Sequence, residues 1–160
     1  MNWFSIIRWI HIISAAAWIG EVLVINVVLV PSLQSTPVEQ RGGFIARVFP
    51  RVFRLASILA LVALSSGLGM SYLAAGWTGL DLIIRSRWGL GILIGGILGL
   101  FLAVFHFVVE SRLKPIARSL DETPDEKEVE RVMRFLQIVP RVGMLVIVAA
   151  FILMMVAARG

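Results

Sequence analysis

Four long apolar stretches, separated by polar segments, dominate the pattern of hydrophobic positions along the chain. Each is close to the ~20 residues that an α-helix needs to cross ~30 Å of hydrocarbon. The predicted spans cover residues 4–30, 52–75, 88–109 and 142–158. We therefore expect an all-α integral membrane four-helix bundle, a single transmembrane domain that includes residues 1–160.

The polar segments carry signals for helix ends. Pro31, Pro50, Pro115 and Pro140 lie near the predicted span ends, where a missing amide donor costs least. Between the third and fourth spans, residues 123–126 read Thr-Pro-Asp-Glu, the order of an N-cap, a proline at the first helical position and a capping-box acid. This predicts a short cytoplasmic helix, which either lies along the membrane or, as we favour, extends the last span.

The basic residues indicate the orientation. Of the 15 Lys and Arg residues, eleven fall near or in the first and third loops: Arg41, Arg47, Arg51, Arg54, Arg112, Lys114, Arg118, Lys127, Arg131, Arg134 and Arg141. The positive-inside rule places these loops in the cytoplasm, so both termini are predicted to lie outside a cell inner (plasma) membrane. The net charge of +5 is thereby explained by topology, and no nucleic-acid binding is predicted.

Composition narrows the chemistry. With 59% hydrophobic and 16% charged residues and a mean hydropathy of +0.92, lipid is the expected solvent. The absence of cysteine excludes disulfides, thiolate metal sites and thioether-linked haem. The phosphate-binding, zinc-protease and serine-hydrolase motifs are also missing, so hydrolytic and nucleotide chemistry are not predicted.

Polar residues inside spans are costly and are therefore candidates for function. One group is expected near the outer face: His11, Met70, Tyr72, Met154 and Met155, with Arg8, Arg85 and Arg87 at the rim. Imidazole suits haem iron or copper, thioethers suit Cu(I) or an axial haem position, and arginines pair with haem propionates. The alternative is that the methionines fill apolar space and the arginines are interfacial anchors.

A second group is expected nearer the cytoplasm. Helix rise places Glu21 level with His106, with Asn26 and Glu110 about one turn further in. Glu21 and His106 are predicted to pair, either to pass protons or hold a cation or as a structural hydrogen bond. His11 lies roughly 15 Å away along the membrane normal, so one haem is not expected to use both histidines.

The third predicted span carries Gly91, Gly95 and Gly99 at intervals of four, followed by Ala103. This stripe leaves one helix face nearly without side chains, which favours close helix packing within the bundle or across a homodimer. His106 follows Gly95 by three helical turns and shares the face.

Residues 8–20, with the sequence RWIHIISAAAWIG, resemble the opening helix of the CopD-type membrane proteins. This superfamily includes the copper-resistance D domain, the HemJ-type protoporphyrinogen oxidase and the membrane part of PuuD-type urate oxidases, which share a pattern close to Leu-His-x-x-x-Ala-x-x-Trp-x-Gly. The stretch FPRVFRL at 49–55 is similar to TMEM205-like and CopD-like second helices, and RWG at 87–89 is loosely similar to the entry of the third. The resemblance implies that His11 binds haem b. The missing lysine of HemJ-like third helices argues against protoporphyrinogen oxidase activity. An enzymatic role, if the chain has one, is implied by the resemblance to be that of a membrane oxidoreductase.

The expected function is accordingly that of a CopD/HemJ-like membrane protein that binds haem b near its outer face and acts in electron transfer. His11 is the expected metal ligand, with Trp18, Met70, Arg8 and Arg87 around the cofactor. The protein is expected to be an oligomer or a subunit of a larger complex, with a redox partner or a quinone. The alternatives are a copper-handling protein for copper transport or resistance, and a structural or assembly subunit without a cofactor.

The predicted orientation is tested by labelling, which is free of background because the chain has no cysteine. A cysteine introduced at Ser35 or Ser119 should resist an impermeant thiol reagent applied to intact cells, and should react once the cells are permeabilised. Labelling in intact cells would contradict the orientation.

Overall fold

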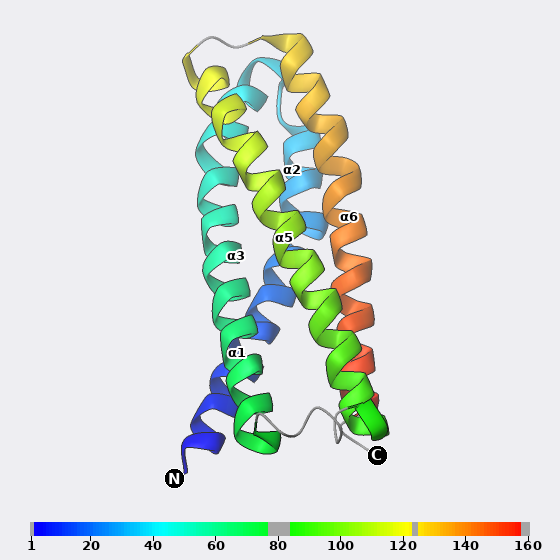
Figure 1. Cartoon of the computed structure of the whole chain (residues 1–160). Coiled ribbons are helices and arrows are strands. Elements are labelled where there is room, and N and C mark those ends of the chain that lie inside the picture. The colour runs from blue at the N-terminus through cyan, green and yellow to red at the C-terminus, as the bar shows by residue number, and fades with distance from the viewer. Residues whose placement is uncertain (1, 77–83, 123–124, 158–160) are drawn as a thin grey trace.

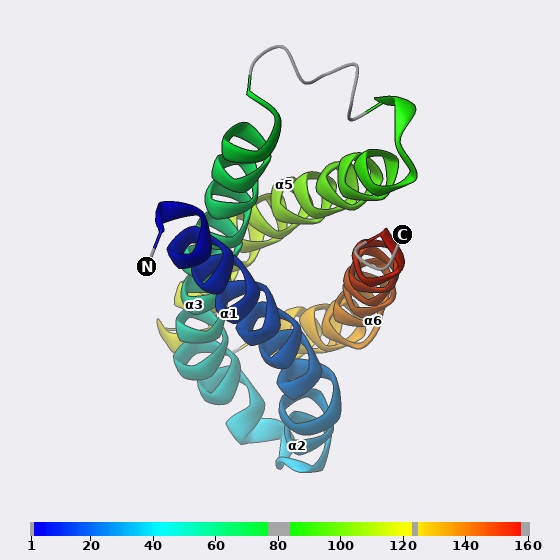
Figure 2. The ribbon, with the colours of Figure 1, turned by 90° about the horizontal axis from the view of Figure 1, so that it is seen from below.

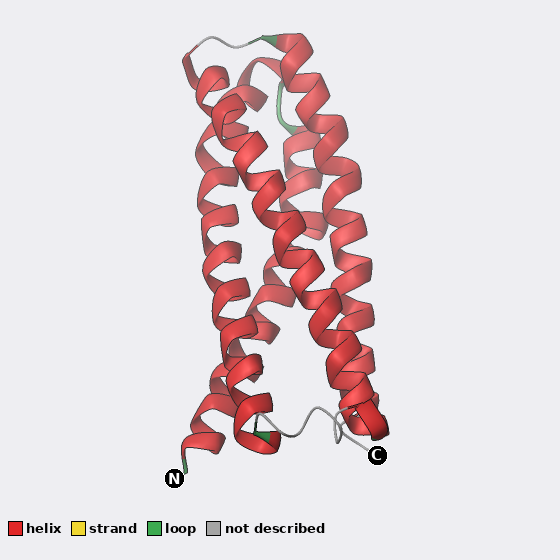
Figure 3. Cartoon of the chain, viewed as in Figure 1, coloured by secondary structure: helices red, strands yellow, loops and turns green. Residues whose placement is uncertain are grey.

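The computed structural model describes residues 2–76, 84–122 and 125–157, and the regular structure in these ranges is helical (Figures 1 and 3). In chain order the elements are α1 (Trp3–Val24), the π-helical turn η1 (Ile25–Leu29), α2 (Val30–Ser35), α3 (Val38–Ala75), α5 (Arg87–Glu122) and α6 (Glu126–Ala157). The first three follow one another without a break. The described part of the chain therefore forms four rods, each long and apolar enough to cross a membrane.

The rods run alternately up and down, so both chain termini lie at one end of the bundle (Figure 1). We call this the terminal end, and we call the opposite end, which holds the α2–α3 turn and the α5–α6 connection, the basic end. In the most apolar window of each rod, only 17% to 28% of the residues are buried inside the bundle. The remaining apolar surface suits contact with lipid, which confirms a multi-pass membrane protein built from four helices.

The helices are longer than the predicted spans. The expected first loop is almost wholly helical, because α2 ends at Ser35 and α3 already begins at Val38. Pro50, Pro115 and Pro140 consequently lie inside helices and not at helix ends. The use of these prolines as signals of helix ends was wrong, because packing continues past them. The span bounds themselves stay predictions, since hydropathy measures only the membrane-embedded part of a helix.

Packing beyond the apolar spans follows one face of α3. Its buried residues recur every three or four positions, the spacing that faces one side of an α-helix: Gly42, Ile45, Phe49, Phe53, Ala56, Ala60 and Ala63. Towards the basic end these side chains pack with buried residues of α5 and α6, among them Leu120 and Val129. This tertiary packing offsets the amide hydrogen bond that Pro50 removes from α3.

The helix predicted between the third and fourth spans is the beginning of α6, which runs unbroken from Glu126 to Ala157. This agrees with the extension of the last span. The predicted N-cap, Thr123, lies outside the described residues. Asp125 caps this end, since its Oδ1 accepts a hydrogen bond of 3.0 Å from the backbone N–H of Lys127. The exposed Glu130–Arg134 pair, 3.9 Å apart, adds little to stability.

The π-helical turn keeps the first rod in register with the core. Ser14, Trp18, Glu21 and Ile25 are buried at intervals of three or four residues, but the next buried residue, Val30, comes five later. A π-helical turn accommodates one extra residue in a helix. It therefore returns Val30 and the residues after it to the face that the preceding part of α1 presents to the bundle.

The rods pair differently at the terminal end. Figure 2 shows the start of α5 beside the end of α6 and away from the start of α1. There α1 contacts α3, with Ile7 against Gly69, whereas Gly91 and Gly95 of α5 face Ala157 and Met154 of α6. The glycine stripe is therefore used within the bundle, which is one of the two interpretations that the sequence left open.

The stripe gives a stability prediction. A Cβ at Gly91 would overlap the Ala157 side chain and lie 3.4 Å from the Leu153 carbonyl oxygen, whereas a Cβ at Gly96 meets nothing within 4 Å. Gly91→Ala should lower the free energy of unfolding in mild detergent by about 1 to 3 kcal/mol through overpacking. Gly96→Ala should cause no loss, because alanine favours the helix. Equal stability of the two variants would contradict this packing.

Candidate functional site

His11 is held against α3 by its Nδ1 atom. Nδ1 lies 2.8 Å from the backbone oxygen of Ala63 and 3.4 Å from Oγ of Ser66. A carbonyl oxygen only accepts hydrogen bonds, so Nδ1 carries the hydrogen and the neutral ring keeps its lone pair on Nε2. Gly67 makes room for the ring, because a Cβ there would lie 3.0 Å from the His11 Cε1 atom.

The other residues predicted around His11 are spread over two helix pairs. Met70 lies on α3, one turn beyond Gly67 towards the terminal end, and is partly buried. Arg8 precedes His11 by one turn of α1, whereas Arg87 begins α5; both are exposed. Among the described residues, no hydrogen bond or ion pair joins either arginine to His11.

Packing explains Trp18, which was predicted to lie beside the cofactor, and two methionines of the predicted outer group. Trp18 is 5% exposed and belongs to the central core with Ala56 and Ala60, two turns further in than His11. The Met154 side chain covers Gly95, and Met155 is 43% exposed on the bundle surface. Met154 thus fills space against α5 and Met155 lies on the surface, whereas Met70 is on the helix that holds His11.

A cavity in the middle of the bundle contains the second predicted group. It measures about 50 Å³, the space open to water centres, which is enough for a few water molecules. Its lining comes from Trp18, Glu21, Val22, Ile25, Phe53, Leu102, Phe105, His106, Val109, Phe135, Leu136, Val139, Pro140 and Gly143. Glu21 is only 9% exposed, and its Oε1 has no hydrogen-bond partner in the described part of the chain.

His106 faces the same cavity and is fixed by α3. Its Nε2 lies 3.2 Å from the Phe53 carbonyl oxygen and 3.0 Å from Oγ of Ser57. The carbonyl requires a donor, so Nε2 carries the hydrogen. The Ser57 hydroxyl in turn donates to Oε2 of Glu110 at 2.6 Å. These contacts form one directed chain from the His106 ring through Ser57 to Glu110.

The predicted pair of Glu21 and His106 is therefore not directly bonded in the structure. Both residues line one cavity, but no hydrogen bond between them is present among the described residues. Sequence reasoning placed the two at one depth and missed Ser57, which draws His106 towards α3. The spacing of four between His106 and Glu110 was the available signal, since it puts both on one helix face.

Asn26 has a structural role beside this cavity. Its Nδ2 donates to the Val22 oxygen at 2.8 Å and to the Pro140 oxygen at 3.0 Å, which ties the first rod to α6. Asn26 itself lies within the π-helical turn. Asn26 therefore fixes the approach of α6 to the residues that flank Glu21.

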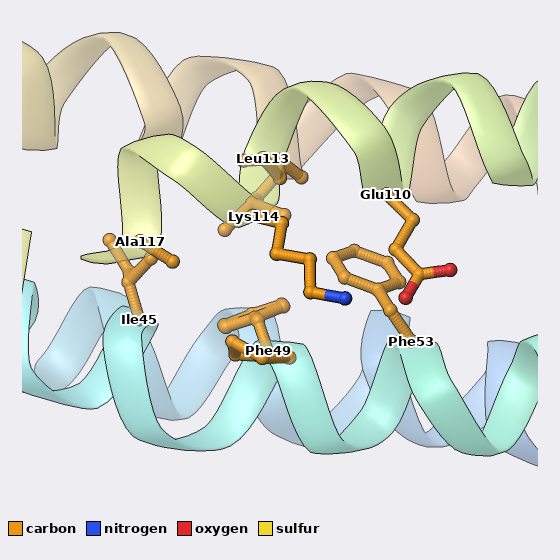
Figure 4. Close-up of a pocket in the computed structure, with 9 residues that line it drawn as sticks. Ile45, Phe49, Phe53, Glu110, Leu113, Lys114 and Ala117 are labelled. Atoms are coloured by element: carbon orange, nitrogen blue, oxygen red, sulfur yellow. The ribbon is translucent and has the colours of Figure 1, made fainter. Parts of the chain in front are cut away.

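Glu110 leads from the cavity towards the basic end. It lines a second hollow together with Lys114, against Phe49 and Phe53 of α3. Figure 4 shows the side chains of Glu110 and Lys114 reaching from α5 towards these two rings. Glu110 and Lys114 are the charged residues of this hollow, whose other lining residues are apolar.

These features define a multi-pass helical membrane protein with two polar centres at different depths, one at His11 and one around the Glu21 cavity. Within the described ranges, no group of three or more His, Cys, Asp or Glu side chains is placed to hold a metal ion. No protein-family model matches the chain, and comparisons with curated proteins and with solved structures find no match.

The bridging role of Ser57 is open to measurement. Ser57→Ala removes the hydroxyl that joins His106 to Glu110, and should lower the free energy of unfolding in detergent by about 1 to 3 kcal/mol, because a carboxylate loses its partner. Ser65→Ala is the matched control, since Ser65 is exposed and its hydroxyl bonds only the Val62 oxygen of its own helix. A loss of equal size in both variants would contradict the bridge.

Proposed function

We propose that this protein binds haem b through His11 near the terminal end and acts in electron transfer. The observation that supports the proposal is the bond from Nδ1 to the Ala63 oxygen. Histidines that ligate metals usually donate their other ring N–H to a carbonyl or carboxylate, which fixes the ring and leaves the second nitrogen for the metal. The Nε2 lone pair of His11 meets this requirement.

The surroundings of His11 suit a haem in their chemistry. Met70 supplies a thioether one turn from Gly67, and Arg8 and Arg87 supply cations at the same end of the bundle for the propionates. Bound haem iron would supply one-electron chemistry, and the protein's own part is to orient the ligand ring.

The proposal includes the orientation of the protein and the membrane that holds it. The basic end faces the cytoplasm of a cell whose inner (plasma) membrane holds the protein, which places the haem near the outer face. The resemblance of residues 8–20 to CopD-type opening helices supports this location. The haem protein works as an oligomer or as a subunit of a larger complex, and exchanges electrons with a redox partner or a quinone.

Copper handling is the second candidate, and one observation favours it. Met70 lies on the helix face that carries Gly67 and Ala63, the residues in contact with His11. An imidazole with a thioether is a donor set suited to Cu(I). A third outcome is a structural or assembly subunit, in which the His11 bond to Ala63 only fixes two helices.

Absorption spectra of the purified protein separate the three. We expect a Soret band with sharp reduced α and β bands. His11→Ala should abolish them, whereas His106→Ala should leave them in place, because His106 lies at another depth and its Nε2 is bonded to α3. Stoichiometric copper without a Soret band would favour the second candidate, and neither signal would favour the structural one. A full Soret band in the His11 variant would contradict the assignment of the ligand.

A further inference from the structure

The central cavity holds a buried acid whose position serves no visible structural purpose. The Glu21 side chain is nine-tenths buried, lines the cavity and leaves Oε1 without a partner in the described chain. An acid in this position destabilises a bundle, because hydrocarbon and apolar side chains cannot replace its bonds to water. The cavity is polar at Glu21 and large enough for water, so water is the partner the geometry offers.

Few other charged groups face this cavity. Among the residues that line it, α1 contributes Glu21, α5 contributes His106, and α3 and α6 contribute no ionisable side chain. No arginine or lysine in the lining fixes Glu21 as a permanent carboxylate. His106 is therefore the other ionisable side chain that lines the cavity with Glu21.

His106 connects the cavity to the basic end. Its Nε2–H donates to Ser57, and the Ser57 hydroxyl donates to Glu110. Glu110 lies in the hollow towards the basic end, where Lys114 is the other charged residue. His106 and Ser57 each both donate and accept hydrogen bonds, and the Glu110 carboxylate accepts at the end of the chain.

We propose that Glu21 is a proton-binding site in the middle of the membrane, which exchanges protons with the basic end through cavity water, His106, Ser57 and Glu110. This role goes beyond haem binding at His11 and does not depend on it. The site's ligand is the proton, and its route is the hydrogen-bonded chain described above.

The transfer balances at each link. The Glu21 carboxyl gives its proton to cavity water, and that water gives a proton to the free Nδ1 of His106. His106 then gives its Nε2 proton to Ser57 Oγ, while the Ser57 hydroxyl proton passes to Glu110. Water, histidine and serine each gain one proton and lose one, so the net change is one proton from Glu21 to Glu110. Rotation of the serine hydroxyl and return of His106 to the tautomer with hydrogen on Nε2 reset the chain for the next proton in the same direction; without this reset, the chain is set for the reverse transfer.

Proton exchange at Glu21 is open towards the basic end only. Beyond Glu21 in the direction of the terminal end, Trp18, Ala60 and Ala63 are at most 5% exposed and form an apolar core. The next polar side chain of α1 in that direction is Ser14. Its hydroxyl donates to backbone oxygens of its own helix, so it does not extend the hydrogen-bonded chain to the terminal end. A proton at Glu21 is thus separated from the terminal end by packed apolar side chains.

The experiment follows the carboxyl C=O stretch of Glu21 by infrared spectroscopy, with the full chain in lipid nanodiscs and the pH changed rapidly. We expect a carboxyl band that titrates, disappears in Glu21→Gln and shifts in Glu21→Asp. Ser57→Ala should slow its response to the pH jump by at least about tenfold, an added barrier of about 1.4 kcal/mol. Ser65→Ala, on the same helix but outside the chain, should respond at the unaltered rate.

Two outcomes would overturn the proposal. The first is a carboxyl region of the infrared spectrum that is the same in the unaltered protein, in Glu21→Gln and in Glu21→Asp, at every pH the protein tolerates. The second is an unchanged response rate in Ser57→Ala. The Soret band reports on His11 separately, so a haem-free preparation would refute the proposed function while leaving this test intact.

Discussion

The close approach of α1 to α3 is the contact on which both polar centres depend. Small residues on α3, namely Ala56, Ala60, Ala63 and Gly67, allow it. In lipid no hydrophobic effect drives helices together, so association relies on small residues that let backbones approach and on polar bonds between helices. The His11 bond to Ala63 supplies one such bond. The same approach seats Trp18 over the alanines, which closes the central cavity on one side.

The fold could be predicted from the sequence because its main signal is hydropathy, which locates apolar helices reliably. The ends of the helices could not be. Pro50, Pro115 and Pro140 look like boundaries in the sequence, yet each sits inside a helix whose buried face continues past it. Tertiary packing there overrides the local cost of a proline. In the sequence, packing shows only as a periodic pattern of buried residues, and this pattern is hard to see where most residues are apolar.

For the candidate sites too, one part could be predicted from the sequence and another could not. Helix rise was sufficient to predict that His11 and His106 lie at different depths and that Glu21 shares the depth of His106. It was insufficient to predict the bonds. A serine in an apolar helix usually bonds its own backbone, so nothing in the sequence marked Ser57 as the residue that bonds the His106 ring to α3.

The length of α3 has a thermodynamic consequence. Its 38 residues span about 57 Å, nearly twice the ~30 Å of hydrocarbon, so a helix that crosses the hydrocarbon once extends beyond it. The part before the predicted span at 52–75 is the part expected to lie outside. The protruding bundle buries Phe49, Leu120 and Leu136, and its stability therefore has the temperature and urea dependence of a soluble domain. The part within the predicted span is held by contacts for which water is not the competing solvent. One continuous helix is thus expected to belong to two solvent regimes, and a denaturant dissolved in water to act first on the part outside the hydrocarbon.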